Sequence, residues 1–385
     1  MKVLQIVRGM DIGGRDGGGE KFGLELTREL KTIGIDVRLC SLSRSSSEVE
    51  KKWITDLTDK GIEVFFACPA PKVDLHQALS VLKAYIRKND ISLVHSQSQR
   101  CTVIMVLLKI FGGIKHLVRT AHTPLEFGVQ WYQSLNRLVF IQFIYPIIVD
   151  VEVGVSGQIV NNLNNRPLYK LMHRNAIKIY NGIPDSVVES QADDLFTAFR
   201  SGLLKNEWII TAAGLMRSYK RFDIAIKSMP MILKGVPQAR LALAGDGPEL
   251  AHLKQLAHEI GVTDQVWFMG QQDNIPAILR ESHLFVLPSQ IEGLSTVVLE
   301  AMAAGVPIIV SDIEGNLELI KNGFNGWVFK LGEPDQLAHA VLDAFHHPEL
   351  CRLYRENSMR VLENFYFHQI VRQYCELYKK LEDII

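Results

Sequence analysis

Short apolar runs alternate with helical patterns along the whole chain, and the alternation occurs twice. This pattern is typical of βαβ units, in which helices join parallel strands. In the first half the predicted strands are residues 3–7, 36–42, 63–66, 92–95, 116–120, 150–155 and 177–180. In the second half they are residues 208–213, 240–244, 265–269, 284–287 and 307–310. The sequence therefore predicts an α/β protein with two Rossmann-like parallel sheets.

The length of the chain also favours two domains. Its 385 residues exceed the usual size of one hydrophobic core. A polar interval follows Pro184 and separates the two sets of predicted strands. We therefore expect a first domain at residues 1–184 and a second at residues 185–366. The last segment, residues 367–385, contains a helical pattern with one broad apolar face.

Charge and cysteine content exclude several classes of protein. The 42 basic and 42 acidic residues cancel, so no overall field favours nucleic acid. The five cysteines have no Cys-x-x-Cys spacing, which favours a reducing compartment and gives no zinc site. The N-terminus has no signal-peptide pattern, and no apolar run is long enough to span a bilayer. We expect a cytoplasmic protein that does not bind nucleic acid.

One segment, residues 138–149, is rich in aromatic and aliphatic side chains and contains a proline. This composition predicts a buried helix that leads into a strand. The alternative is a peripheral contact with the inner face of a membrane, made by an interfacial helix.

Two carboxylates eight residues apart flank the start of a helix predicted at residues 297–304. Glu292 precedes this helix and Glu300 lies inside it. Gly293 and Ser295 open the helix, so its free N–H groups and positive dipole end face the loop that carries Glu292. Such an end suits a phosphate or diphosphate, and a carboxylate accepts hydrogen bonds from two neighbouring hydroxyls. The arrangement predicts a nucleotide-sugar site.

Glycine-rich loops follow predicted strands in both halves. The loop at residues 11–20 follows the first strand, and Gly247 lies in the turn Ala244-Gly-Asp-Gly-Pro. Glycine lets the backbone approach a ligand closely. A dinucleotide is one ligand of such loops, but no acidic residue ends the second predicted strand to hold its ribose.

Basic and imidazole side chains follow other predicted strands. His95 and His122 end two strands of the first half, and Arg217, Lys220 and Arg221 follow the first strand of the second half. Sites in α/β proteins collect their side chains at such strand ends. Cations there would neutralise a diphosphate leaving group. His95 is the candidate for contact with a molecule that would accept the sugar.

The segment from Glu292 to Glu300 resembles the Glu-x7-Glu motif of the retaining GT-B glycosyltransferases of family 4. The resemblance continues through Gly305-Val-Pro, Asn316-Leu-Glu-Leu-Ile and Asn325-Gly-Trp-Val-Phe. It implies two Rossmann-like domains that face each other across a cleft, with a final helix that crosses back to the first domain. It also implies retaining sugar transfer from a nucleotide diphosphate donor to a hydroxyl acceptor, in the assembly of polysaccharide, lipopolysaccharide or glycolipid at the cell surface.

The resemblance implies a role for each candidate residue. Glu292 and His122 would contact the transferred sugar, and Glu300 would bind the ribose hydroxyls. Lys220, helped by Arg217, would stabilise the departing diphosphate. The other donor contacts that it implies are Gly18, Gly19, Gly247, Gly293, Leu294, Ser295 and Thr296.

The chain departs from the family pattern at one position. The family pattern Gly-Arg-x4-Lys places an arginine where this chain has Leu215, whereas Lys220 matches. Either Arg217 or Arg221 supplies the second cation, or Lys220 acts alone.

The resemblance also sets the expected partners, namely a nucleotide diphosphate sugar and a sugar or lipid-linked acceptor. We expect no metal or other cofactor, because no Asp-x-Asp motif stands beside the nucleotide segments and cations can neutralise the diphosphate. Two other functions stay open. A GT-B nucleotide-sugar epimerase would act on the donor alone, and a non-catalytic nucleotide-sugar-binding protein would tolerate Leu215.

Overall fold

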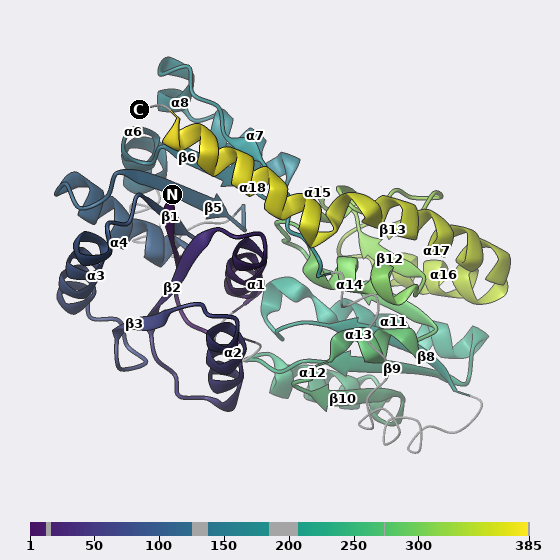
Figure 1. Cartoon of the computed structure of the whole chain (residues 1–385). Helices are drawn as coiled ribbons and strands as arrows, with labels where there is room; N and C mark the ends of the chain where they lie inside the picture. The colour runs from purple at the N-terminus through teal and green to yellow at the C-terminus, as the bar shows by residue number, and fades with distance from the viewer. Residues whose placement is uncertain (13–16, 125–137, 185–206, 273, 384–385) are drawn as a thin grey trace. The chain divides into compact units, whose positions relative to one another are not determined.

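The computed structural model describes residues 1–12, 17–124, 138–184, 207–272 and 274–383. The chain divides into two compact units. The first consists of Met1–Asn181 together with Phe367–Ile385, and the second of Gly182–Tyr366. Each unit contains a parallel sheet with helices packed on its faces (Figure 1).

The sheet of the first unit has all its paired strands parallel. Their order is β3 (Val64–Cys68), β2 (Asp36–Ser43), β1 (Lys2–Val7), β4 (Leu93–Ser96), β5 (His116–Ala121), β6 (Val151–Gly154) and β7 (Ile177–Lys178). Val3 of β1 pairs with Val37 on one side and with Leu93 on the other. Because helices cover both faces of the sheet, its strands are apolar along most of their length.

Helices cover both faces of this first sheet. They are α1 (Gly18–Thr32), α2 (Glu48–Asp59), α3 (Leu75–Asn89), α4 (Gln99–Ile110), the π-helical turn η1 (Phe140–Ile144), α6 (Tyr145–Ile148), α7 (Gly157–Asn164), α8 (Pro167–Leu171) and α18 (Phe367–Glu382). Helices α1 and α18 pack on the face that carries Val3 and Val118. Helices α3, α4 and α6 pack on the face that carries Leu4 and Ile6. The last helix of the chain is thus part of the first unit.

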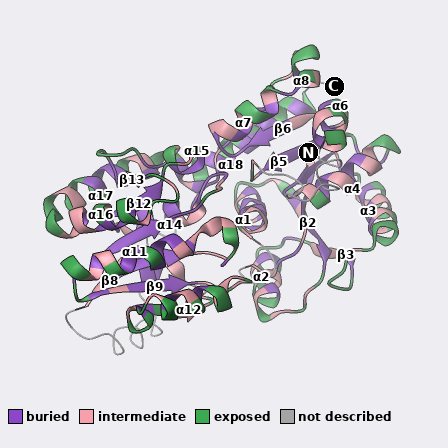
Figure 2. Cartoon of the chain, turned by 180° about the vertical axis from the view of Figure 1, so that it is seen from behind, coloured by how far each residue is buried: buried purple, intermediate pink, exposed green. Residues whose placement is uncertain are grey.

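The sheet of the second unit is also parallel. Its order is β10 (Val266–Gly270), β9 (Ala239–Ala244), β8 (Trp208–Ala213), β11 (Leu284–Leu287), β12 (Ile308–Ser311) and β13 (Trp327–Phe329). Its helical segments are η2 (Ser218–Lys220), α11 (Phe222–Gly235), α12 (Leu250–Glu259), η3 (Thr263–Gln265), α13 (Ile275–Arg280), α14 (Thr296–Ala304), α15 (Glu314–Leu317), α16 (Pro334–His346), α17 (Pro348–Leu362) and η4 (Glu363–Phe365). Figure 2 shows that the strands are buried and that the exposed residues lie on the outer sides of the helices.

The predicted fold class, α/β with two Rossmann-like sheets, is confirmed. Each predicted strand is present, with ends that differ by at most two residues. Strand β13 was not predicted, because three residues at the edge of a sheet give too short an apolar run. Within the described residues, no helix is both long enough and apolar enough to cross a bilayer.

The prediction for residues 138–149 was wrong in one respect. The segment is helical and leads into β6, as expected, but only one of its sides is buried. Leu138, Phe143 and Ile147 are each more than half exposed. Only one side of the segment packs on the sheet, through residues such as Ile141 and Tyr145, so the other side faces solvent although it carries no charge.

Candidate functional site

The strand order of each sheet identifies where a ligand binds. In the second unit the chain runs from β8 outward to β9 and β10, and then returns to β11 on the other side of β8. In the first unit the same reversal occurs between β1 and β4. Loops that leave neighbouring strands in opposite directions open a crevice at the carboxyl ends of those strands, and ligands of open α/β sheets bind there.

An ion pair joins the two loops at the switch point of the second unit. Lys220 Nζ, after β8, lies 2.7 Å from Glu292 Oε1, after β11. The Gln290 N–H also donates to the carbonyl of Tyr219 at 2.7 Å. The stem of Lys220 passes over Gly214, where a Cβ would lie 3.5 Å from Lys220 Cε. The structure therefore brings together two residues that the sequence predicted for one site.

The start of α14 follows Glu292 directly in the chain. Ser295 is the N-cap, but its side chain makes no capping hydrogen bond. Its Oγ is buried and has no hydrogen-bond partner among the described residues. Gly293 and Leu294 are also buried, while Thr296 begins the helix. The unpaired hydroxyl and the free N–H groups of the first turn can therefore donate to an anion.

Glu300 lies on the second turn of α14 and is only 8% exposed. It shares the helix whose start follows Glu292, so both carboxylates of the predicted motif belong to the β11–α14 connection. The contact of Glu300 with a ribose stays a prediction.

Gly247 has a packing reason to be glycine. Its φ is +155°, and a Cβ would lie 2.6 Å from the carbonyl oxygen of Met216. At Gly245, a Cβ would lie 2.0 Å from the carbonyl oxygen of Gly214. The Met216 N–H also donates to the carbonyl of Asp246 at 2.8 Å. These glycines let the loop after β9 lie against the loop after β8, and the predicted donor contact of Gly247 stays a prediction.

The two arginines near Lys220 differ in their partners. Arg221 makes two hydrogen bonds to the carboxylate of Asp223, at 2.9 and 3.1 Å, and this pairing raises the pKa of Arg221. Arg217 is exposed and forms no ion pair with another described residue. Of the two, Arg217 has the side chain that is available for an anion. The side chain of Leu215 is partly buried and carries no charge.

In the first unit, the predicted residues gather at the start of α1. His122 follows β5 directly, and its ring centroid lies 5.4 Å from that of Phe22. At Gly19 a Cβ would lie 3.0 Å from His122 Cδ2, so glycine lets α1 approach the imidazole. Gly18 and Gly19 are the first residues of α1, and their N–H groups have no acceptor within the helix.

Two family models match the chain, one on each half. The model described as Glycosyltransferase Family 4 matches residues 16–186. The model described as Glycosyl transferases group 1 matches residues 195–361. The chain belongs to the family 4 glycosyltransferases.

Individual relatives of this glycosyltransferase support the same conclusion. It is 28% identical over 367 residues to N-acetyl-alpha-D-glucosaminyl L-malate synthase of Bacillus anthracis. This match covers 94% of the chain and 93% of that relative. It is 24% identical over 302 residues to UDP-Gal:alpha-D-GlcNAc-diphosphoundecaprenol alpha-1,3-galactosyltransferase of Escherichia coli, with 75% and 76% covered. These relatives favour a glycosyltransferase over an epimerase or a non-catalytic binding protein.

A solved structure extends the likeness to the fold. Anabaena Alr3699/HepE in complex with UDP and glucose matches the glycosyltransferase with a TM-score of 0.82 at 18% identity. The match covers 99% of this chain and all of that one. At this identity the likeness concerns the fold alone, and it confirms the predicted GT-B class.

Sequence reasoning missed Gln97 of the glycosyltransferase. This residue follows β4 at the switch point and is 1% exposed. Its Oε1 lies 3.0 Å from His122 Nε2, and its Nε2 donates to Gln5 Oε1 at 3.0 Å. Because the amide nitrogen donates to Gln5, its oxygen faces His122 and accepts the Nε2–H. The one available signal was its place directly after a predicted strand.

Hydrogen bonding and burial together define the state of His122. With Nε2 donating to Gln97, Nδ1 is the unprotonated nitrogen of the neutral ring. Burial lowers the pKa of His122 to about 4, and the side chain of Asn181 only partly opposes this. His122 is therefore neutral near pH 7. Gly23 lets α1 approach Gln97, since a Cβ at Gly23 would lie 2.7 Å from Gln97 Cγ.

His95 is not an acceptor-side residue, so that prediction was wrong. It is fully buried between strands. Its Nε2 lies 2.8 Å from Thr120 Oγ1, and its Nδ1 lies 2.6 Å from the hydroxyl of Tyr378. Burial, reinforced by His122, lowers the pKa of His95 to about 3. The ring is a neutral member of the hydrogen-bonded core beneath His122.

We expect Gln97→Glu to raise the pKa of His122 to or above its ordinary value of 6.5. A carboxylate in place of the amide oxygen would accept the Nε2–H bond and stabilise the imidazolium. NMR titration of the ring measures this pKa, and the pH profile of kcat/KM should gain an acidic limb near the same value.

Gln97→Leu is the matched control, because it tests whether the Gln97 amide positions the His122 ring. It removes the hydrogen bond without adding a charge, so it should lower kcat by roughly tenfold without raising the pKa. If Gln97→Glu raises the pKa of His122 and leaves the pH profile unchanged, His122 takes no part in transfer.

Proposed function

We propose that the glycosyltransferase passes a sugar from a nucleotide diphosphate donor to a hydroxyl of a sugar or lipid-linked acceptor. The Lys220–Glu292 pair at the switch point, beside the start of α14, is the observation that carries this proposal. The ammonium, the free N–H groups of α14 and the Ser295 hydroxyl suit a diphosphate. The carboxylates of Glu292 and Glu300 suit the hydroxyls of the sugar and the ribose.

The relatives suggest the chemical class of both substrates. The name of the Escherichia coli relative specifies a UDP-linked sugar and a lipid-linked acceptor, and Alr3699/HepE was solved with UDP and glucose. A uridine diphosphate sugar is therefore the first donor to test. The setting that fits is assembly of cell-surface polysaccharide, lipopolysaccharide or glycolipid, by a cytoplasmic protein that contacts the inner face of the membrane.

The proposed transfer retains the anomeric configuration of the donor sugar. The bond between the anomeric carbon and the diphosphate oxygen breaks, and the acceptor oxygen bonds to that carbon on the same face. The acceptor proton passes to the departing diphosphate. Glu292 is paired with Lys220 at 2.7 Å, which makes its carboxylate a poor nucleophile and disfavours a covalent glycosyl intermediate. Its role is to orient the sugar.

Lys220 supplies the charge that a metal ion would otherwise supply. An ammonium has three N–H donors, so Lys220 can keep Glu292 and still donate to the diphosphate. Arg217 and the start of α14 add positive potential at the same strand ends. Metal-independent transfer is part of the proposal.

Transfer in the presence of EDTA is expected to proceed at the normal rate and to give a product with the anomeric configuration of the donor. NMR coupling constants of the new glycosidic linkage report that configuration. An inverted product would rule out the same-face mechanism. A rate that EDTA abolishes and magnesium restores would contradict metal independence alone.

Glu300→Ala is expected to abolish stabilisation by the nucleotide. A ligand at about 100 times its Kd stabilises a protein by roughly 2.7 kcal/mol, which a thermal-shift assay detects. The screen compares UDP, GDP and ADP and their sugars with wild type and with Glu300→Ala. Glu259→Ala, on the exposed side of α12, is the control and should keep the full shift. A full shift in Glu300→Ala would remove this residue from the donor site.

A further inference from the structure

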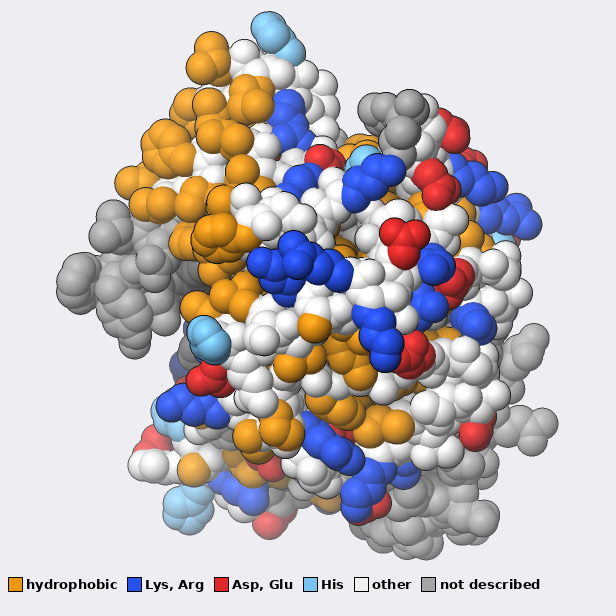
Figure 3. All heavy atoms as spheres, turned by 60° about the vertical axis from the view of Figure 1, so that its left-hand side comes forward, with side chains coloured by type: hydrophobic (Ala, Val, Ile, Leu, Met, Phe, Trp, Pro, Cys, Tyr) orange, Lys and Arg blue, Asp and Glu red, His pale blue; other side chains and the backbone are white. Residues whose placement is uncertain are grey.

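Exposed large hydrophobic side chains gather on one side of the first unit (Figure 3). They come from the end of α4, from the η1–α6 segment and from α8, and these elements pack against one another. Each is between 40% and 75% exposed. We call this set the apolar face, and its members are Ile110, Phe111, Leu138, Val139, Phe143, Ile147, Leu171 and Met172. A contiguous exposed apolar surface indicates a binding function.

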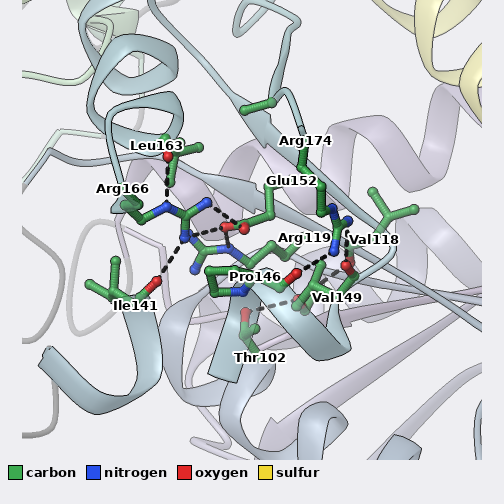
Figure 4. A network of polar contacts seen from close by, with 12 residues as sticks. Thr102, Val118, Arg119, Ile141, Pro146, Val149, Glu152, Leu163, Arg166 and Arg174 are labelled. Atoms are coloured by element: carbon green, nitrogen blue, oxygen red, sulfur yellow. Dashed lines mark hydrogen bonds and ion pairs between the residues drawn. The ribbon is translucent and has the colours of Figure 1, made fainter. Parts of the chain in front are cut away.

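Buried ions fix the backbone beneath the apolar face (Figure 4). Arg166 donates to the carbonyl of Ile141 at 2.9 Å and to the Glu152 carboxylate at 2.6 Å. Arg174 donates to the carbonyl of Pro146. Arg166 and Glu152 are at most 2% exposed. The apolar side chains therefore project from a backbone that the buried arginines hold in place. Their exposure is a property of the folded structure.

The chain around the apolar face is strongly basic. Residues 100–184 contain nine Lys and Arg but three Asp and Glu, although the whole chain has no net charge. Two of those acids and three of those bases pair with one another, since Asp150 pairs with Lys109 and Glu152 pairs with Arg119 and Arg166. Lys115, Lys170 and Lys178 are exposed.

The positive charge of the chain segment that carries the apolar face distinguishes between two occupants. A second copy of the chain would bring two basic surfaces together, and like charges oppose such an interface. An anionic bilayer complements both features, because its headgroups attract the lysines and its interfacial region accepts the apolar side chains. The observations therefore favour a lipid surface.

We propose that the apolar face docks the glycosyltransferase on an anionic membrane, with its side chains inserted at the headgroup boundary. The inference deepens the proposed function, and it rests on that function in linking the surface to a lipid-linked acceptor. The η1–α6 part of the apolar face lies in the connection between β5, at whose end His122 lies, and β6. The docking surface and His122 thus belong to one unit.

Sedimentation of the full chain with lipid vesicles tests this proposal. The wild type is expected to bind vesicles of phosphatidylcholine mixed with phosphatidylglycerol, and to bind less as salt is raised. The double variant Phe143→Glu with Ile147→Glu should bind at least about tenfold more weakly. The control is Phe324→Glu with Leu353→Glu, at side chains of the second unit that are 44% and 47% exposed. This control should bind like the wild type.

Three results would overturn the proposal. They are no binding of the wild type to anionic vesicles, equal binding by the apolar-face variant, and a wild-type dimer that this variant converts to a monomer without any vesicle binding. Light scattering supplies the oligomeric state. Failure of the proposed function would give a different result. Vesicle binding would persist, but no nucleotide sugar would support transfer to any acceptor.

Discussion

Lys220→Ala is expected to lower kcat by roughly 100- to 1,000-fold while changing KM little. Its ammonium lies where the loops after β8 and β11 meet. In the proposed mechanism the diphosphate would gain negative charge beside it as the bond to the sugar breaks. An interaction made mainly in the transition state appears in kcat, and one lost donor of this kind costs about 3 to 4 kcal/mol. Steady-state kinetics with a saturating acceptor measures the effect.

Two controls separate the chemical role of Lys220 from a structural one. Lys227→Ala removes an exposed ammonium from α11 and should leave kcat unchanged. The variant Lys220→Ala with Glu292→Gln removes both charges of the pair, so no carboxylate is left without its partner. If this double variant regains the wild-type rate, then the loss in Lys220→Ala came from the unpaired Glu292. A raised KM with an unchanged kcat would mean that Lys220 only binds the donor.

The sequence predicted the pieces of this site because the rules that place them are local. A strand ends where an apolar run ends, and side chains that follow it lie at the carboxyl edge of a parallel sheet. Lys220 and Glu292 were therefore both predicted at strand ends. Their contact depends on β8 and β11 being neighbours, which is a property of strand order. That order arises from the packing of the whole sheet, and no window of sequence encodes it.

Other features escaped prediction because burial does not follow polarity at every residue. Glu152 and Arg166 are charged and nevertheless buried, since each neutralises the other. Phe143 and Ile147 are apolar and nevertheless exposed, since their segment packs on the sheet through its other side. The contact of Gln97 with His122 could not be predicted, because it depends on how α1, β4 and β5 pack together. Pairings between distant segments decide each of these cases.

Glu152→Ala is expected to reduce the free energy of unfolding of the first unit by about 3 to 5 kcal/mol, because it would leave two buried guanidinium groups without their counter-charge. Arg119 Nε lies 2.7 Å and Arg166 Nη2 2.6 Å from the Glu152 carboxylate, and all three residues are at most 2% exposed. Each guanidinium also lies over an aromatic ring, 4.4 Å from that of Tyr145 and 4.2 Å from that of Tyr169. Urea unfolding measures the change.

The pH dependence of the free energy of unfolding tests the contribution of Glu152 independently. Burial by itself would raise the pKa of Glu152, but the two arginines outweigh it and hold the pKa below its usual 4.5. The unfolded chain then binds the proton more readily, so the contribution of Glu152 is present above about pH 4.5 and is lost as the pH falls below that value. Glu48→Ala is the control, because Glu48 forms an exposed pair with Lys51, and exposed ion pairs contribute little to stability. If Glu152→Ala costs no more than this control, the buried pairs do not hold the backbone of Ile141 under the apolar face, and vesicle binding should survive the substitution.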